Sequence, residues 1–343
     1  MPYTPHSSTV DHRRSQLYPP VLYIVVPCYN EQDVIMTTIR TLTDMLQGLI
    51  LDKLVSDRSR LLFVDDGSRD STWLLLTLES SKNKRVAALK LARNAGHQKA
   101  LLAGLMYARE VSDCVVSMDA DLQDDVQAVR ELVQQYLNGS EIVYGIRSDR
   151  SADRWLKRWS AEQYYEWMRR LGVPLVYNHA DYRLMSRKAL DYLAQYREIN
   201  LFLRGIVPLL GLRTSEVRYV RQERAAGQSK YPLRKMLSFA WEGLTSFTIK
   251  PMRLVAMLGI IGVGISLIVA MYVLLSNWLH QTESGWSSIM ISLWFMGSLQ
   301  LLALGIVGEY IGKIYAEVKH RPLYLIDEVI HEPIIEEGYE KEA

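Results

Sequence analysis

The sequence predicts an α/β fold, in which a doubly wound and mainly parallel sheet is followed by interfacial helices and two transmembrane helices. Short apolar runs alternate with segments of helical periodicity through residues 21–147, as expected for βαβ units. Acidic or polar residues directly follow several of these runs, at the edge where such sheets bind ligands. Two stretches, 254–279 and 285–308, contain no charged residue, and each exceeds the roughly 20 residues that a membrane-spanning helix needs.

The first half of the chain repeats a strand–turn–helix plan. A β-branched run from Val21 ends at Pro27, and apolar residues then recur at helical spacing over 31–48. The strand at 61–65 ends in an acidic turn, and Asp70 or Ser71 is the expected N-cap of the helix after it. The other elements expected here are strands at 86–91, up to Met118 and at 141–147, a helix that follows 94–98, and a helix at 126–137.

From residue 151 the pattern changes. Residues 153–171 are rich in Trp, Tyr and Arg, which suits either a membrane interface or packing against the sheet. Residues 178–185 are expected to be a polar connection, and two short helices should follow at 187–196 and 201–210. An edge strand is predicted at 216–220, before a polar loop at 221–231 and an interfacial helix at 233–250.

Charges that flank the two spans predict their orientation. Lys250 and Arg253 precede the first span, and further cations follow the second between 313 and 321, whereas the connection at 277–288 has neither Lys nor Arg. By the positive-inside rule, both long ends of the chain are cytoplasmic. The predicted organisation is a disordered tail at 1–20, a catalytic domain at 21–232, an interfacial amphipathic helix at 233–252, two spans at 253–312 and a cytoplasmic tail at 313–343.

Composition removes several classes of function. The 343 residues include 40 Lys and Arg against 38 Asp and Glu, so no overall field points to nucleic acid. The two cysteines, Cys28 and Cys114, lie far apart in apolar runs and form neither a disulfide framework nor a metal-binding spacing. His97 and the other histidines show no pairing at zinc-ligand spacing, which argues against a zinc site.

Three acids follow the strand that ends at Met118, namely Asp119, Asp121 and Asp124. Carboxylates at the carboxyl end of a strand suit Mg²⁺ or Mn²⁺, which bind through one or two carboxylates together with substrate phosphates. The pattern therefore predicts a metal–diphosphate site, and the alternative is an acidic loop that caps the next helix. Asp119 and Asp121 are the expected metal ligands, while Asp124 is expected to cap a helix or to support the site.

Other strand ends should meet this acidic pair if the sheet is doubly wound. An aromatic and an acid, Tyr29 and Glu31, follow the first strand, and Asp66 follows the second, which suits a nucleobase and its ribose. Arg147 ends a later strand and offers a fixed fork of donors to an anionic group. Each cluster alone is more often a turn or a cap, so the prediction rests on their joint placement.

The loop at 221–231 carries several cations. Arg224, Ser229 and Lys230 are suited to closing over a phosphate, and the alternative is a basic turn that attracts anionic lipid head groups. Asp181 is a lone acid in the polar connection, which by itself favours a cap or a salt-bridge partner over a catalytic base.

Four ordered motifs, 26–31, 64–72, 118–124 and 224–231, resemble those of family 2 glycosyltransferases of the polyprenyl-phosphate branch. The chain is most similar to bacterial undecaprenyl-phosphate (bactoprenol) glucosyltransferases, with dolichol-phosphate-mannose synthases as more distant relatives. The resemblance covers residues 21–325 and includes both spans. It departs from the family pattern after Gln123 and Asp124, where Asp125-Val-Gln stands in place of a Pro-Pro-Glu-like continuation.

The resemblance implies a GT-A fold, a UDP-hexose donor, a divalent cation (Mg²⁺ or Mn²⁺) and a polyprenyl-phosphate acceptor in a bacterial inner or cell membrane. Asp181 matches a position proposed as the base in the bacterial glucosyl enzymes, and Asp121, Asp181 and Arg147 are the catalytic residues that we carry over. Arg224, Ser229 and Lys230 would bind phosphate. The donor would contact Pro27, Tyr29, Glu31, Val64, Asp66, Asp119, Ala120, Gln123 and Arg147.

The expected reaction is transfer of a hexose, with glucose favoured, to undecaprenyl phosphate for glycosylation of the cell envelope. Galactose, N-acetylglucosamine or an aminoarabinose derivative are the alternative sugars, because the sugar contacts lie in loops that periodicity cannot place. A membrane scaffold that retains the fold without catalysis is the alternative from another class. The sequence leaves open whether the protein forms a homo-oligomer.

Overall fold

The computed structural model describes residues 18–147, 179–196, 198, 203–220 and 285–330, with isolated helical positions between 252 and 271. Several predicted elements lie outside these residues: most of the N-terminal tail, the aromatic helix at 153–171, the loop at 221–231, the interfacial helix and most of the first span. The chain divides into two compact units, one of 1–165, 174–230 and 322–343 and the other of 166–173 and 231–321.

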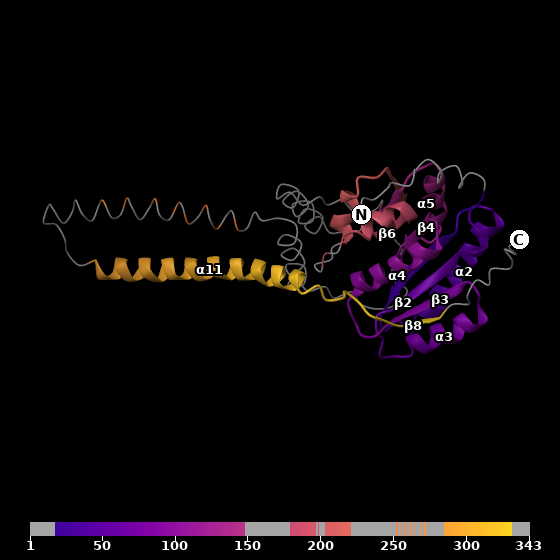
Figure 1. Ribbon diagram of the computed structural model, residues 1–343, viewed down its shortest axis with the longest axis horizontal. Helices are drawn as coiled ribbons and strands as arrows, with labels where there is room; N and C mark the ends of the chain where they lie inside the picture. Colours follow the sequence, from indigo (N-terminus) through magenta and orange to yellow (C-terminus); the bar gives the residue numbers. More distant parts are fainter. Residues whose placement is uncertain are drawn as a thin grey trace, which may run out of the picture. The chain divides into compact units, whose positions relative to one another are not determined.

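The first unit is built on an eight-stranded mixed sheet with the order β7-β5-β6-β4-β1-β2-β3-β8. Figure 1 labels β2, β3, β4, β6 and β8 of this sheet. Its centre is parallel, because β1 pairs in parallel with both β2 and β4, and β2 pairs in parallel with β3. The strands are β1 (Leu22–Cys28), β2 (Arg60–Asp65), β3 (Val86–Leu91), β4 (Cys114–Ser117), β5 (Ile142–Arg147), β6 (His179–Ser186), β7 (Thr214–Tyr219) and β8 (Ile326–Ile330).

Helices cover both faces of this sheet, as the doubly wound prediction requires. Apolar side chains of α2, α3 and α5 join one core with alternate residues of β1, such as Ile24 and Val26. On the other face, Gly104 of α4 approaches Val25 so closely that a Cβ there would lie 2.4 Å from Val25 Cγ1. The helices that the structure describes in this unit are α2 (Ile35–Leu51), α3 (Thr72–Lys82), α4 (His97–Val111), α5 (Ala128–Leu137), α7 (Arg187–Leu193) and α8 (Leu203–Leu209).

The polar connection predicted at 178–185 is wrong. Residues 179–186 form β6, which lies between β4 and β5 and is antiparallel to both. The prediction failed because Asp181 and Arg183 gave the segment a polar pattern, whereas in the fold the two side chains form an ion pair and are buried together. Antiparallel insertion also means that β6 begins at the edge where β4 and β5 end.

The C-terminal segment is not only a tail. Residues 326–330 form β8, which pairs antiparallel with β3 and covers the edge of the sheet. The Leu325 carbonyl accepts a hydrogen bond from the Ala92 N–H at 2.9 Å, and Lys90 lies 3.8 Å from Asp327. Edge strands expose unpaired backbone groups, so a returning strand here satisfies the outer side of β3.

The second unit contains α11 (Trp286–Val318). Among the residues that the structure describes, one segment, Phe295–Val318 within α11, is long and apolar enough to cross a bilayer. It overlaps the predicted second span, and α11 continues beyond Gly308, where the uncharged stretch ends.

Candidate active site

The loop after β1 is tied to the loop after β2. The Asn30 N–H donates to Ser68 Oγ at 2.9 Å, and the Glu31 N–H donates to Thr72 Oγ1 at 2.9 Å. Asn30 adopts a left-handed backbone conformation with φ of 55°, which Asn tolerates better than most residues. This arrangement keeps Tyr29 exposed and Glu31 half-buried at the carboxyl edge of the sheet.

Pro27 and Val64 are neighbours in the register of β1 and β2, and both are buried. The Val64 side chain packs towards α4, since a Cβ on Gly104 would lie 2.7 Å from Val64 Cγ2. A role for Val64 in donor binding would therefore have to use its backbone. The assignment of Pro27, Tyr29, Glu31 and Val64 to a nucleoside site stays a prediction.

Asp66 organises the approach to α4. One carboxylate oxygen accepts a hydrogen bond from the Ala95 N–H at 2.7 Å, and the other accepts one from the Gly96 N–H at 2.9 Å. Gly67 is required beside it, because its φ is +68° and a Cβ would lie 2.7 Å from the Asn94 nitrogen. Burial raises the pKa of Asp66, although the two backbone donors oppose that shift. Asp66 thus holds the segment that presents His97.

The loop after β4 carries the predicted metal ligands. The Ala120 carbonyl accepts a hydrogen bond from Thr38 Oγ1 at 2.7 Å, and Asp121 Oδ1 accepts one from the Gln123 N–H at 3.2 Å. These contacts fix the backbone between Asp119 and Gln123 at the end of β4. The chain crosses from β3 to β4 on the far side of β1, so the loop lies at the topological switch point of the sheet.

The electrostatics of Asp119 suit a cation. Burial raises the pKa of Asp119; His97 opposes the shift, and the carboxylates of Asp124, Asp181 and Asp121 add to it. Mutual repulsion among carboxylates is relieved by a bound divalent ion. Within the described part of the chain, no three His, Cys, Asp or Glu side chains are grouped to hold a metal alone. The Asp119–Asp121 pair instead fits a site in which two carboxylates and the phosphates of a substrate together hold Mg²⁺ or Mn²⁺.

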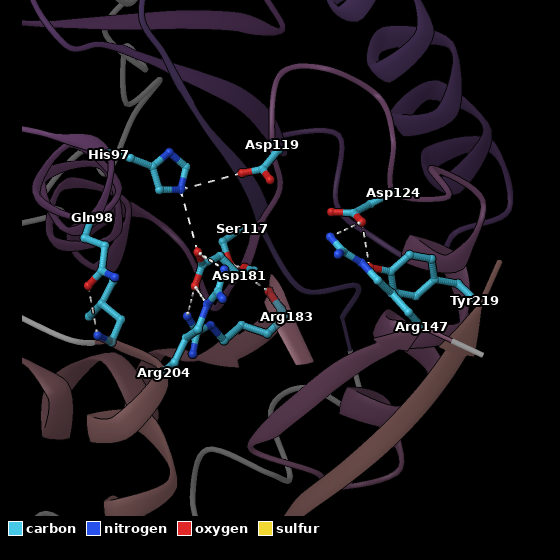
Figure 2. Close-up of polar contacts among 11 residues, drawn as sticks. His97, Gln98, Ser117, Asp119, Asp124, Arg147, Asp181, Arg183, Arg204 and Tyr219 are labelled. Carbon is cyan, nitrogen blue, oxygen red and sulfur yellow. Dashed lines mark hydrogen bonds and ion pairs between the residues drawn. The ribbon is translucent and has the colours of Figure 1, made fainter. Parts of the chain in front are cut away.

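Asp124 lies at the centre of a polar group on one side of this loop (Figure 2). Its Oδ1 accepts a hydrogen bond from Tyr219 Oη at 2.6 Å and lies 3.4 Å from Arg147 Nη2. Arg147 Nε also donates to Tyr219 Oη at 3.2 Å. Burial raises the pKa of Tyr219, and Asp124 adds to the shift, so the phenol stays protonated as a donor. Asp124 is therefore a supporting acid that holds Arg147.

Asp181, near the start of β6, lies at the centre of a second polar group. Its carboxylate forms a two-point contact with Arg204, Oδ1 to Nε at 3.1 Å and Oδ2 to Nη2 at 3.0 Å. Oδ1 also accepts a hydrogen bond from Arg183 Nη2 at 3.0 Å. His97 Nε2 lies 3.7 Å from Asp181 Oδ2 and 3.6 Å from Asp119 Oδ1, so it links this group to the loop after β4 (Figure 2).

The charges in this second group determine its protonation. Burial opposes ionisation of Asp181, but His97, Arg204 and Arg183 outweigh it and hold the pKa of Asp181 well below its usual range. Burial likewise opposes protonation of His97, but Asp181 and Asp119 outweigh it and raise the pKa of His97. A carboxylate this weakly basic is a poor proton acceptor. The salt-bridge interpretation of Asp181 from the sequence agrees with this geometry.

Sequence reasoning missed four residues of these two groups: His97, Arg183, Arg204 and Tyr219. His97 is considered in the sequence analysis only as a zinc ligand, and Arg204 lies within the helix expected at 201–210 without being singled out. Arg183 and Tyr219 depend on β6 and β7 lying beside β4 and β5, which local periodicity does not encode. Arg224, Ser229 and Lys230 lie outside the described residues.

A mixed sheet with a parallel centre, paired acids at its switch point and cationic side chains on both sides agrees with the GT-A fold that the sequence motifs imply. The chain belongs to glycosyl transferase family 2, whose model matches residues 23–193. The uncharacterised glycosyltransferase YkoT of Bacillus subtilis (strain 168) is 52% identical over 308 residues, which is 90% of this chain and 91% of that protein.

Relatives with a named activity also align over most of the chain. The bactoprenol glucosyl transferase of Shigella phage SfV is 35% identical over 305 residues, 88% of this chain and 97% of its own. A solved structure of glucosyl-3-phosphoglycerate synthase from Mycobacterium tuberculosis, in complex with Mn²⁺, UDP and phosphoglyceric acid, is 18% identical with a TM-score of 0.42. That match covers 71% of this chain and 82% of the synthase. The family resemblance expected from the four motifs is confirmed.

Proposed function

We propose that this glycosyltransferase transfers a hexose, with glucose as the favoured sugar, from a UDP-sugar to undecaprenyl phosphate at the cytoplasmic face of the membrane. The observation that carries the proposal is the Asp119–Asp121 pair at the switch point, in a chain that aligns over 88% of its length with a bactoprenol glucosyl transferase. The product would be a lipid-phosphate sugar for glycosylation of the cell envelope.

Donor binding would use the carboxyl edge of the sheet. Tyr29 and Glu31 are suited to the nucleoside, and Asp119 and Asp121 would hold a divalent cation on the diphosphate. When bound, Mg²⁺ or Mn²⁺ supplies Lewis-acid stabilisation of the departing UDP. Arg147, fixed by Asp124 and Tyr219, offers a rigid cation to the same phosphates.

Transfer to the lipid phosphate needs little proton chemistry. The second pKa of a phosphate monoester is about 6, so the nucleophilic oxygen is already ionised at neutral pH. Its attack on the anomeric carbon, in line with the leaving UDP, would invert the configuration. Asp181 is engaged by Arg204 and Arg183, which supports a positioning role for its carboxylate over a role as general base.

The membrane arrangement is part of the proposal. Residues 254–279 would form a first span and α11 a second, with the short connection outside and both long ends in the cytoplasm, as the flanking cations favour. A lipid acceptor would then enter from the same membrane that anchors the enzyme.

The test is a donor and acceptor panel. The full-length protein in detergent is incubated with Mn²⁺, undecaprenyl phosphate and labelled UDP-glucose, UDP-galactose or UDP-N-acetylglucosamine, and lipid-linked label is measured. The proposal expects label from UDP-glucose and none when undecaprenol replaces the phosphate. UDP-dependent thermal stabilisation without transfer from any donor would favour the non-catalytic scaffold.

A further inference from the structure

Asp119 and Asp121, the two acids that would hold a divalent cation, are fixed by different parts of the fold. Asp121 Oδ1 accepts a hydrogen bond from the Gln123 N–H at 3.2 Å, inside its own loop. The Asp119 side chain is 42% exposed, and in the described part of the chain His97 is the only side chain that contacts it by a hydrogen bond or an ion pair. The orientation of the Asp119 carboxylate therefore depends on His97.

His97 faces two carboxylates with one ring nitrogen (Figure 2). Nε2 lies 3.6 Å from Asp119 Oδ1 and 3.7 Å from Asp181 Oδ2. Carboxylate oxygens only accept hydrogen bonds, so a nitrogen that faces two of them carries a proton and serves as the donor. The other charged groups near His97 are Asp66 and Arg204, and Arg204 is itself bonded to Asp181. The Nε2–H group is thus a link between the two acids.

Asp181 is the more firmly fixed of these two acids. Its side chain is 8% exposed, and its carboxylate accepts hydrogen bonds from Arg183 and Arg204. Its backbone carbonyl accepts a hydrogen bond from Ser117 Oγ, at the end of β4 and two residues before Asp119. Asp181 is thus held both by β4 and by two guanidinium groups, so it gives the imidazole ring a fixed partner.

The backbone on either side of His97 is fixed as well. Asp66 accepts hydrogen bonds from two backbone N–H groups of the segment that precedes it. Gln98 Oε1 accepts a hydrogen bond from the Leu203 N–H at 3.2 Å, which ties the start of α4 to the start of α8. His97 is therefore held at its backbone and, through Asp181, at its ring. A side chain fixed in this way can hold a more exposed carboxylate in one orientation.

We propose that His97 is a positioning residue for the metal, which takes its own orientation from Asp181 and holds Asp119 ready to bind the divalent cation. The inference rests on the proposed function, since it assigns a supporting residue to one of the two acids that would bind the ion. The contact engages Oδ1 of Asp119, and Oδ2 has no bonded partner among the described residues. Hydrogen-bond partners of metal-binding carboxylates orient them and increase their affinity for the ion.

Two amide substitutions in the full-length protein test the role of the ring nitrogen. His97→Gln places an N–H donor close to the position of Nε2, whereas the shorter side chain of His97→Asn does not reach it. Both variants should fold, because the His97 side chain is 47% exposed. Arg109→Gln is the control elsewhere on α4, where Arg109 pairs with Glu110 and Asp191. Calorimetric binding of UDP over a series of Mn²⁺ concentrations gives the Kd for Mn²⁺ in the UDP complex, and thermal unfolding is measured in EDTA.

His97→Asn should raise the Kd for Mn²⁺ about ten- to hundredfold, the usual effect of losing a partner that orients a metal ligand. His97→Gln and Arg109→Gln should keep a Kd close to that of the wild type, and the two amide variants should unfold at the same temperature in EDTA. A purely structural role predicts a lower unfolding temperature for His97→Asn with an unchanged Kd. That result would overturn the inference, as would an equal change of Kd, or none, in the two amide variants.

The wild-type protein separates this inference from the proposed function. If it binds UDP in a Mn²⁺-dependent manner but transfers no sugar, the proposed function fails, and the comparison of His97→Asn with His97→Gln still decides the role of His97. If it transfers sugar while Mn²⁺ leaves UDP binding unchanged, the transfer reaction stands and the inference is overturned, because Asp119 then has no ion to bind.

Discussion

Two aspartates near the loop after β4 hold different kinds of partner. Asp124 accepts a hydrogen bond from a neutral phenol, Tyr219, and lies near a single cation, Arg147. Asp181 contacts Arg204 and the buried Arg183. The first group is close to electrically balanced and serves to aim one arginine. In the second group, one carboxylate contacts two guanidinium groups, and one of these, Arg183, is buried. The difference indicates that loss of the acid should cost more stability in the second group than in the first.

The largest expected effect is on hexose transfer, and it comes from the loop after β4, which lies between the two groups. Asp121→Ala should lower hexose transfer by about a thousandfold, the scale of losing charge stabilisation of a leaving group, while the protein stays folded. Transfer and UDP–Mn²⁺ binding are measured, with Asp44→Ala on the exposed side of α2 as the control. Retained turnover in Asp121→Ala would show that neither group works beside a metal–diphosphate site.

Removing the acid of the second group should affect stability most. Asp181→Ala leaves Arg183 buried without its carboxylate, and breaking a buried pair from one side costs about 3–5 kcal/mol. Urea unfolding of the first unit measures the change. Asp52→Ala breaks an exposed ion pair with Arg130 and should cost no more than about 1 kcal/mol. Equal losses in the two variants would mean that Asp181 does not compensate a buried charge.

The first group should tolerate the loss of one partner better. Tyr219→Phe removes a hydrogen bond to a charged group, and because Arg147 remains, a loss of about 1.5 kcal/mol is expected. Tyr192→Phe, at an exposed position on α7, is the control. A loss as large as that of Asp181→Ala would remove the contrast between the groups.

The smallest expected effect is a change in acid sensitivity. The pKa of Asp181 is lowered in the folded protein, so below about pH 4, the ordinary aspartate value, the unfolded chain binds a proton that the folded chain does not. Stability should then fall with falling pH by up to about 1.4 kcal/mol per unit from this group. Asp181→Asn should reduce that slope. An unchanged slope in unfolding curves collected from pH 5 to pH 3 would contradict the shift.

Much of the first unit could be predicted because its signals are local. The parallel centre of the sheet followed from apolar runs with turns between them, and the strand at Val86–Leu91 was predicted with its observed bounds. The pairing of Asp119 with Asp121 at a strand end needed only the order of residues. The resemblance to family 2 glycosyltransferases rested on four such local motifs, and the match to the family model agrees with it.

What the sequence by itself determined is most of the strands and helices of the first unit, though not β6 or β8, together with the acidic pair and the family, because each depends on neighbouring residues and their periodicity. Only the tertiary structure decided which strands lie side by side. Insertion of β6 between β4 and β5 places a polar segment in the interior of the sheet and brings Asp181 beside His97. The return of β8 to β3 is of the same kind. Such pairings are stabilised by contacts between residues far apart in the chain, so local sequence patterns do not predict them.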